Sequence, residues 1–457
     1  MVNRTPFEDK VLARIRPSTE ERDQICGVAR RILDAISSGG QAQGMVVGSI
    51  ARNTWVSGEH DIDIFLLFSP ALSREALEEQ GMALARRVAM QFTDRYSEKY
   101  AEHPYICAMI EGVDVDLVPC YAVESATAIQ SAVDRTPFHT RYIKDRINGL
   151  VDDVLLLKQF ARAGGIYGSD QMTEGFSGYL CELLVLQCGG FAPLLSAASA
   201  WRPGVVIDPE QHAAKQFNEP LVVIDPVDPK RNVAAAVSLT RMMGFVELAR
   251  GYCAAPSARF FSLPDRSPIT REGLADILAK RRTHLYAITF ATPPLIPEIV
   301  VPQLKRSVAV IAELLERHGY PVHNARYEPG ESQCIFLFEL LLKELPAIRT
   351  HSGPPIWNRE NADKFFNKYA GGQNGHFPYI SEGKYAIEVA REYPDAKSLL
   401  NSGAILGTSL GKHVRQSLEA GFSVAEGADC YSPEFASFIK RFFDRSSPLA
   451  RVLRKEL

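Results

Sequence analysis

The sequence predicts an α+β multidomain protein, and three observations lead to this class. The chain has 457 residues, 46% apolar and 23% charged, which is typical of a soluble globular protein of several domains. Short apolar or alternating runs, which predict strands, occur within residues 45–118 and 284–342. Helical spacing of apolar residues dominates between these regions and again from about Asp395. We therefore expect four parts: an α/β unit (1–150), a helical unit (151–264), an α+β unit (265–390) and a mainly helical tail (391–457).

The α/β unit begins with an amphipathic helix. Ser18 and Glu21 form a capping-box pattern, and apolar residues follow at helical spacing as far as Ile36, before Gly39 and Gly40 end the helix. A second helix is expected over residues 73–92. Around it, four short runs predict strands at residues 45–47, 61–68, 106–110 and 113–118.

From about Val151 the pattern is helical, and a Pro- and Asp-rich loop is expected at 225–232. Residues 178–200 are apolar and nearly long enough to span a bilayer, but Glu182 and the Gly189-Gly190 pair interrupt them, so a buried helix pair is predicted. The strongest helical segments are 154–163, 178–186 and 233–251. Beyond a proline-rich linker, strands at 284–291 and 334–342 flank a helix at 304–317.

Charge and cysteine usage exclude some classes. The net charge of −3 gives no general affinity for nucleic acid, so any RNA must be bound by local basic patches. The last eighteen residues carry one such excess, six basic against two acidic residues, which either grips RNA phosphates or is only a solvated helical face. No two of the eight cysteines have C-x2-C spacing and no apolar signal core begins the chain, which favours reduced thiols in a cytoplasm over a zinc site. The six basic residues are Lys440, Arg441, Arg445, Arg451, Arg454 and Lys455; the two acids are Asp444 and Glu456.

Paired carboxylates are the most informative feature of the sequence. Side chains alternate along a strand, so Asp61 and Asp63 project from one face while their apolar neighbours enter the core. The run Val113–Val118 repeats the pattern with Asp114 and Asp116. Three or four carboxylates on neighbouring strands predict a site for two Mg²⁺ ions and in-line nucleotidyl transfer; the alternative is an exposed strand edge with solvated acids.

A possible phosphate-binding turn precedes the first acid pair. Gly48 and Ser49, separated from Asp61 by eleven residues, predict a tight turn whose N–H groups and hydroxyl meet a triphosphate. Arg52, one turn later, would add charge-assisted hydrogen bonds to the same phosphates. Residues 407–413 imitate a phosphate-binding P-loop, but they are one residue short and end in His413, so this alternative is rejected.

Five strings of the sequence extend this pattern: GSIARNTW (48–55), AEHPY (101–105), VDVDLVPCY (113–121), AVDRTPFH (132–139) and GFSGYLCEL (175–183). The Gly-Ser and Asp-x-Asp pattern resembles the polymerase β nucleotidyltransferase superfamily, and the five strings together resemble the archaeal, class I CCA-adding enzymes over essentially the whole chain. Asp61 stands where the family pattern also accepts Glu, a change that keeps the ligand type. The resemblance implies a polymerase β-like nucleotidyltransferase head, a helical neck, an α+β body that binds RNA and a tail that binds tRNA. It also implies a homodimer that adds or repairs the 3′-terminal CCA of tRNA from CTP and ATP, without a template.

The resemblance also implies roles for particular residues. Asp61, Asp63 and Asp116 would hold the metal ions as the catalytic group, with Asp114 the less certain acid. Arg231 would select the incoming base, because its planar donors match cytosine O2 and N3 or adenine N1; without the resemblance, a solvated loop explains it equally well. Without the family, Lys158 is a weak signal and Tyr167 is more typical of a core residue. The full nucleotide-binding set is Gly48, Ser49, Arg52, His139, Lys158, Tyr167 and Arg231.

Three other functions are compatible with a two-metal core. A template-free poly(A) polymerase would add a long run of A to many RNAs. A small-molecule nucleotidyltransferase would leave roughly 200 residues of body and tail without an evident use. A catalytically inactive RNA-binding relative is opposed by the intact acids.

Overall fold

The structure is a computed structural model that describes residues 4–59, 61–100, 103–126, 128–264, 267–372 and 376–454. Four residues considered above, Ala101, Glu102, Lys455 and Glu456, lie outside this set. The chain divides into two compact units, Met1–Asp265 with Ser446–Leu457 and Arg266–Arg445. Both combine helices and sheets, which confirms the α+β multidomain class; the four-part division stays a prediction.

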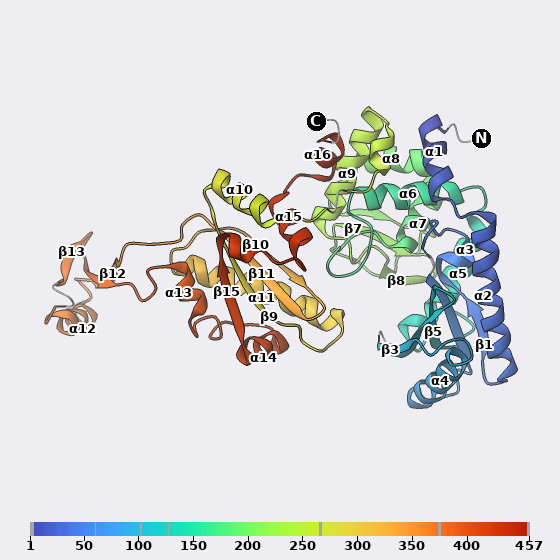
Figure 1. Ribbon diagram of the computed structural model, residues 1–457, viewed down its shortest axis with the longest axis horizontal. Helices are drawn as coiled ribbons and strands as arrows, with labels where there is room; N and C mark the ends of the chain where they lie inside the picture. The colour runs from blue at the N-terminus through green and yellow to red at the C-terminus, as the bar shows by residue number, and fades with distance from the viewer. Residues whose placement is uncertain are drawn as a thin grey trace. The chain divides into compact units, whose positions relative to one another are not determined.

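Within the described residues, the first unit contains two sheets and ten α-helices (Figure 1). Its helices are α1 (Pro6–Ile15), α2 (Thr19–Ser38), α3 (Gly48–Arg52), α4 (Arg74–Ala89), α5 (Thr136–Arg146), α6 (Val151–Ala163), α7 (Gly178–Cys188), α8 (Phe191–Ala198), α9 (Leu239–Ala254) and α16 (Pro448–Leu453). Its strands are β1 (Gln43–Val46), β2 (Asp61–Phe68), β3 (Tyr96–Tyr100), β4 (Pro104–Ile110), β5 (Val113–Tyr121), β6 (Val205–Ile207), β7 (Leu221–Asp225) and β8 (Asp228–Asn232).

A five-stranded mixed sheet, in the order β1-β2-β5-β4-β3, carries the acid pairs. Its central strands β2 and β5 run parallel, and their apolar side chains alternate into a core shared with α2 and α4. Ser18 caps α2 with the predicted capping box, in which its hydroxyl accepts from the Glu21 N–H and the Glu21 carboxylate accepts in return. The strand β3 was not predicted, because it is mostly exposed and lacks an apolar face.

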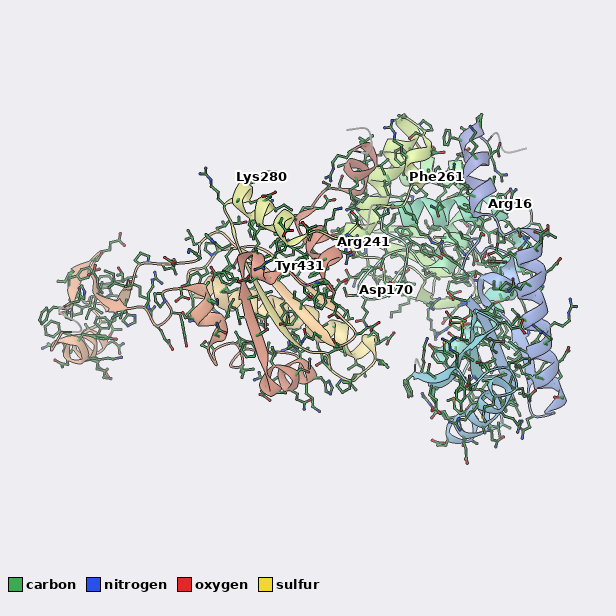
Figure 2. The ribbon with its side chains drawn as sticks, in the orientation of Figure 1. Arg16, Asp170, Arg241, Phe261, Lys280 and Tyr431 are labelled. Carbon is green, nitrogen blue, oxygen red and sulfur yellow. The ribbon has the colours of Figure 1, made fainter. Side chains whose placement is uncertain are left out.

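The helical part of the first unit has a separate core built around Phe160 of α6. Its ring contacts several aromatic rings, among them that of Phe261, with ring centroids 6.0 Å apart. Figure 2 labels Phe261 in this part of the first unit. The apolar stretch after residue 177 forms α7 and α8, whose apolar side chains mostly lie in this core, as predicted. These two helices are bent by 92°, and no single helix among the described residues is long and apolar enough to cross a membrane.

Two local predictions for this region were wrong. Residues 225–232 are not a loop: β7 ends at Asp225 and β8 returns antiparallel to it, in a three-stranded sheet with β6. The chain tolerates Pro229 in β8 because this strand is at the edge of the sheet. The last predicted helix of the region begins at Leu239, after the N-cap Ser238, rather than at residue 233.

The second unit is built on a four-stranded antiparallel sheet, β10-β11-β9-β15, with a small three-stranded sheet, β12-β14-β13, beside it in the sequence. The central strand β11 is buried over nearly its whole length because apolar clusters cover both faces. The elements are α10 (Arg271–Arg281), β9 (His284–Ala291), α11 (Pro297–Arg317), β10 (Val322–Pro329), β11 (Gln333–Leu340), β12 (Ile348–Pro355), α12 (Arg359–Tyr369), β13 (Tyr379–Ser381), β14 (Lys384–Ala390), α13 (Ala396–Asn401), α14 (Lys412–Ala420), β15 (Phe422–Glu426) and α15 (Ala436–Phe443).

Candidate active site

The four strand acids lie in two adjacent rows of the five-stranded sheet. Because β2 and β5 pair in parallel register, Asp63 lies opposite Asp116 and Asp61 lies opposite Asp114. Burial, together with the charges of Asp116 and Asp61, raises the pKa of Asp63 to about 6, against the opposing effect of Arg52. Burial also raises the pKa of Asp116. The acids are therefore close enough to repel one another.

Gly48 is required where it stands beside Asp63. Its φ of +69° favours glycine, and a Cβ there would lie 2.1 Å from Asp63 Oδ2. The adjoining Val47 N–H donates to the backbone oxygen of Asp63 at 2.9 Å. The predicted tight turn is thus present at the end of β1, and it brings the first turn of α3, with Ser49, next to the acid row.

Arg52 and Lys158 share a buried carboxylate, Glu182 of α7. Arg52 Nε lies 2.9 Å from Glu182 Oε2, and Lys158 Nζ lies 3.8 Å from Glu182 Oε1. Lys158 also donates to the Thr54 backbone oxygen at 2.7 Å, and the Thr54 hydroxyl donates to Glu182. Lys158, Glu182 and Thr54 are almost completely buried. Burial lowers the pKa of Lys158, and Glu182 opposes this effect.

Tyr167 lies near Lys158, and both side chains reach the first residue of α7, Gly178. A Cβ placed on Gly178 would be 3.2 Å from the Tyr167 hydroxyl and 3.5 Å from Lys158 Nζ, so both polar ends converge there. The Arg162 guanidinium carbon lies over the Tyr167 ring, 4.5 Å from its centroid. Tyr167 is therefore next to the predicted lysine and is only partly buried.

His139 and Arg231 meet on a second buried carboxylate, Asp225 at the end of β7. His139 Nε2 lies 2.8 Å from Asp225 Oδ2, and Arg231 Nη1 donates to the same oxygen at 2.7 Å. Burial lowers the pKa of His139, and the Asp225 contact opposes this. The charge of Arg52 also lowers the pKa of His139, as it does that of Asp63. Arg52 therefore lies within electrostatic range of both the acid row and the His139 cluster.

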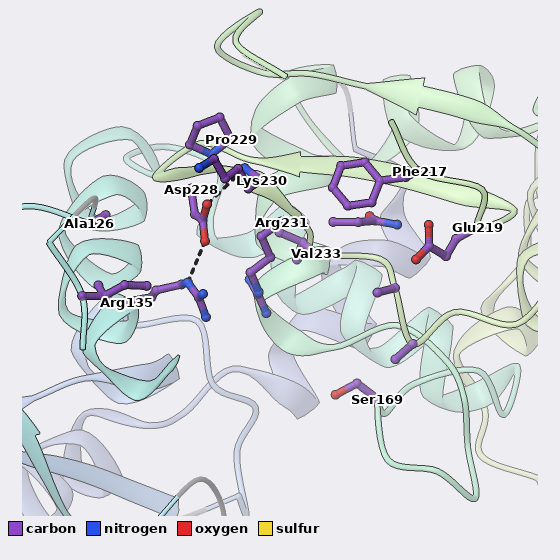
Figure 3. Close-up of a pocket in the computed structure, with 14 residues that line it drawn as sticks. Ala126, Arg135, Ser169, Phe217, Glu219, Asp228, Pro229, Lys230, Arg231 and Val233 are labelled. Atoms are coloured by element: carbon purple, nitrogen blue, oxygen red, sulfur yellow. Dashed lines mark hydrogen bonds and ion pairs between the residues drawn. The ribbon is translucent and has the colours of Figure 1, made fainter. Parts of the chain in front are cut away.

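Arg231 also lines a hollow of about 720 Å³ in the first unit. Figure 3 shows Arg231 in the middle of the lining residues, in view between Arg135 and Glu219. Arg135 Nε donates to Asp228 at 2.8 Å, and Phe217 adds an aromatic ring to the lining. The hollow thus offers cationic, acidic and aromatic groups around a volume sufficient for a small-molecule ligand.

Sequence reasoning missed the two carboxylates that hold the predicted cations. Glu182 was visible as a lone charge in an apolar helix, and such a residue is seldom buried without a partner. Asp225 was visible as an acid that ends the apolar run Leu221–Ile224. The partners of Glu182, Lys158 and Arg52, are 24 and 130 positions away along the chain, and His139 is 86 positions from Asp225, so spacing could not identify these pairs; Arg231 alone is near its carboxylate, six positions from Asp225.

The strand acids are the residues that could hold a metal ion. Their donors are carboxylate oxygens, which suit a hard divalent cation, and a bound cation would offset both the burial and the like-charge repulsion that raise the pKa of Asp63. Within the described residues, no three His, Cys, Asp or Glu side chains already form a group that could hold a metal ion. The chemistry of the donors fits a metal, although the side chains are not gathered around one.

Three family models match the chain in order. Residues 29–139 match a nucleotidyltransferase domain, residues 152–262 the second domain of tRNA nucleotidyltransferases, and residues 281–427 the C-terminal domain of CCA-adding enzymes. The first unit therefore contains a polymerase β-like nucleotidyltransferase domain, the class that the acid rows define.

Whole-chain relatives identify the family. The CCA-adding enzyme of Methanoregula boonei is 64% identical over 99% of both chains. That of Methanosarcina acetivorans is 42% identical over 94% of this chain and 97% of the relative, and that of Haloarcula marismortui is 39% identical over 92% and 94%. The chain belongs to the archaeal CCA-adding enzymes, the class I tRNA nucleotidyltransferases, which confirms the resemblance found in the sequence.

Proposed function

We propose that this chain adds or repairs the 3′-terminal CCA of tRNA, taking CTP and ATP as substrates without a nucleic-acid template. CCA addition at the tRNA 3′ end is the function of the family to which it belongs. The observation that carries the proposal is 64% identity with a CCA-adding enzyme over 99% of both chains. The two acid rows in register on β2 and β5 supply the chemistry expected of such an enzyme.

The proposed reaction is attack of the tRNA 3′-hydroxyl on the α-phosphate of CTP or ATP, with pyrophosphate leaving. Asp61, Asp63 and Asp116 would hold Mg²⁺, and Asp114 lies in the adjoining row opposite Asp61. Mg²⁺ bound there would activate the attacking hydroxyl and stabilise the leaving oxygen. The protein itself contributes a fixed sheet that keeps the carboxylates in register.

Phosphate binding is assigned to Gly48, Ser49, Arg52 and Lys158. The turn at Gly48 brings backbone N–H groups next to the acids, where a triphosphate would meet them. Arg52 and Lys158 share the single negative charge of Glu182, so when both are protonated this cluster keeps one positive charge for a phosphate. Glu182 also fixes the two cations before the nucleotide binds.

Nucleoside recognition is assigned to His139, Tyr167 and Arg231. Arg231 would donate to acceptors of the base, because its planar guanidinium can match cytosine O2 and N3 or adenine N1. His139 and Tyr167 lie beside the carboxylate clusters and would contact the nucleotide there.

A homodimer is a further part of the proposal. It rests on the family resemblance, and analytical ultracentrifugation of the purified chain tests it: a sedimentation coefficient of a single chain at micromolar concentration contradicts it.

The decisive experiment supplies tRNAs that end before C, after C, after CC or after CCA with each nucleoside triphosphate in turn. We expect C, C and A to be added in order, and then no further addition. Long runs of A on several RNAs would instead indicate a poly(A) polymerase. Binding of tRNA without any extension would indicate an inactive relative.

A further inference from the structure

The buried Asp225 carboxylate is the shared partner of four hydrogen-bonding groups. Its Oδ2 lies 2.8 Å from His139 Nε2 and accepts from Arg231 Nη1 at 2.7 Å. Its Oδ1 accepts from the Tyr179 hydroxyl at 3.3 Å and from the Val227 N–H at 3.1 Å. Three of these four donors are side chains, and two of them belong to the proposed nucleotide site.

The charge states of this cluster follow from its partners. Burial alone would raise the pKa of Asp225, but the His139 hydrogen bond and the charge of Arg231 outweigh it, so the pKa is lowered and the group is ionised at neutral pH. A carboxylate only accepts hydrogen bonds, so His139 Nε2 must carry a hydrogen. The His139 ring also stacks on the Tyr179 ring with centroids 4.2 Å apart. Asp225 therefore fixes both the ring orientation and the tautomer of His139.

The same carboxylate fixes Arg231. One guanidinium nitrogen is bound to Asp225, while the side chain stays 37% exposed and lines the 720 Å³ hollow. Its other donors remain available on the side of the hollow. Cytosine and adenine present ring-nitrogen acceptors to such a donor array, whereas the N3–H of uracil and the N1–H of guanine present hydrogens that oppose it. The orientation of Arg231 therefore affects base choice more than the rate of chemistry.

We infer that Asp225 is the positioning residue for base selection: by holding Arg231 and His139 on one carboxylate, it sets the preference for CTP and ATP over UTP and GTP. This inference rests on the proposed function and names a selectivity determinant of the same site. Asp225 acts through Arg231 and contacts no base itself.

The test compares Asp225→Asn with wild type, measuring kcat and KM for each triphosphate on a tRNA that lacks its CCA end. Loss of a charged hydrogen-bond acceptor should lower the ratio of kcat/KM for CTP to that for UTP on the order of tenfold. The same substitution in an Arg231→Ala background should leave this ratio unchanged, since Asp225 acts through that arginine. A wild-type ratio in Asp225→Asn, or an equal loss in the Arg231→Ala background, overturns the inference.

Asp153 provides a matched control. It is also buried, and it also accepts from an arginine, Arg4, and from a backbone N–H, that of Phe191. Asp153→Asn should therefore lose comparable stability and keep the CTP to UTP ratio of wild type; an equal change of the ratio in this variant overturns the inference.

If Asp225→Asn does not fold, Tyr179→Phe tests whether Asp225 sets the preference for CTP over UTP. It removes one hydrogen bond to Asp225 and keeps the ring that stacks on His139. The ratio should fall by about threefold, as expected for the loss of one long hydrogen bond, 3.3 Å between the Tyr179 hydroxyl and Asp225 Oδ1, and an unchanged ratio overturns the inference. If wild type itself added neither C nor A to the tRNA, the proposed function would fail first, and the two failures are thereby distinguished.

Discussion

Replacing Asp63 by Asn is expected to stabilise the metal-free protein at neutral pH. The Asp63 side chain is partly buried, and its carboxyl has a pKa raised from 3.8 to about 6, by burial first and then by Asp116 and Asp61, against the attraction of Arg52. Ionising Asp63 in the folded chain is therefore unfavourable unless a cation is bound. Asparagine keeps the size of the side chain and removes the charge.

The magnitude and the sign follow from this pKa. A carboxyl with a folded pKa above its unfolded value takes up a proton in the folded state between about pH 4 and pH 6, so its contribution to stability falls as the pH rises through that range. The rise from 3.8 to about 6 corresponds to at most about 3 kcal/mol above pH 6. Asp63→Asn should recover part of this amount at pH 7 and almost none near pH 4.

Urea unfolding in the presence of EDTA, from pH 4 to pH 8, measures the effect on the first unit. Asp34→Asn, on the exposed side of α2, is the control, and it should change the free energy of unfolding by less than about 0.5 kcal/mol at every pH. Adding Mg²⁺ at pH 7 should stabilise wild type more than Asp63→Asn, because a bound cation stabilises only the state that holds it. Equal stability of the two proteins at pH 8 in EDTA would refute the raised pKa of Asp63 and the unfavourable burial of its charge.

Three further outcomes are expected. Asp116→Asn should abolish nucleotide addition and leave tRNA affinity within about twofold of wild type, as filter binding and primer extension measure; substantial turnover would contradict the role of this acid. Glu182→Gln should lower the free energy of unfolding by about 3–5 kcal/mol, because it leaves two buried cations without their anion, whereas Glu98→Gln at an exposed pair should lower it by no more than about 1 kcal/mol. Neutralising Lys440 and Arg441 should reduce the slope of log Kd against log salt for tRNA by about 1 to 2, and an unchanged slope means that neither contacts a phosphate.

Substitution of Lys440 and Arg441 is preferred to deletion of the last eighteen residues. The Ser447 hydroxyl donates to Glu247 of α9 at 2.6 Å, and Val452 is buried in the helical core of the first unit. Arg451 donates to the Gly164 backbone oxygen at 3.2 Å. Deletion would therefore remove packing as well as charge, and single-charge substitutions separate the two effects.

Much of the fold could be predicted because its elements follow simple periods. The capping box at Ser18 and the alternating run at Asp61 each identified an element that the structure contains. The wrong predictions fall where the local amino-acid composition disfavours the secondary structure that is observed. The hairpin strand β8 has the sequence DPKRN, which lacks β-forming residues and is held by pairing with β7 and by the Asn232 side chain, whose oxygen accepts from the Val223 N–H.

The site, like the fold, has features that local sequence patterns predict and features that depend on distant contacts. A period of two places Asp61 and Asp63 on one face, but their alignment with Asp114 and Asp116 depends on the parallel pairing of β2 and β5, which no local pattern specifies. The roles of these residues remain predictions. The need for glycine at position 48 also depends on a distant residue, since the carboxylate that excludes a Cβ belongs to Asp63.

The presence of Glu182 and Asp225 beside the predicted cationic residues is explained by a general constraint on buried charges. A lysine or arginine that is held in a protein interior before its ligand arrives must be paired with a resident anion, because an isolated buried charge is too costly. Glu182 serves Arg52 and Lys158, and Asp225 serves Arg231. One carboxylate between two cations leaves an attraction for phosphate, whereas one carboxylate bound to a partly exposed arginine leaves directed donors for a base. Under the proposed function, the difference between the two clusters would correspond to the difference between binding a triphosphate and reading a nucleobase.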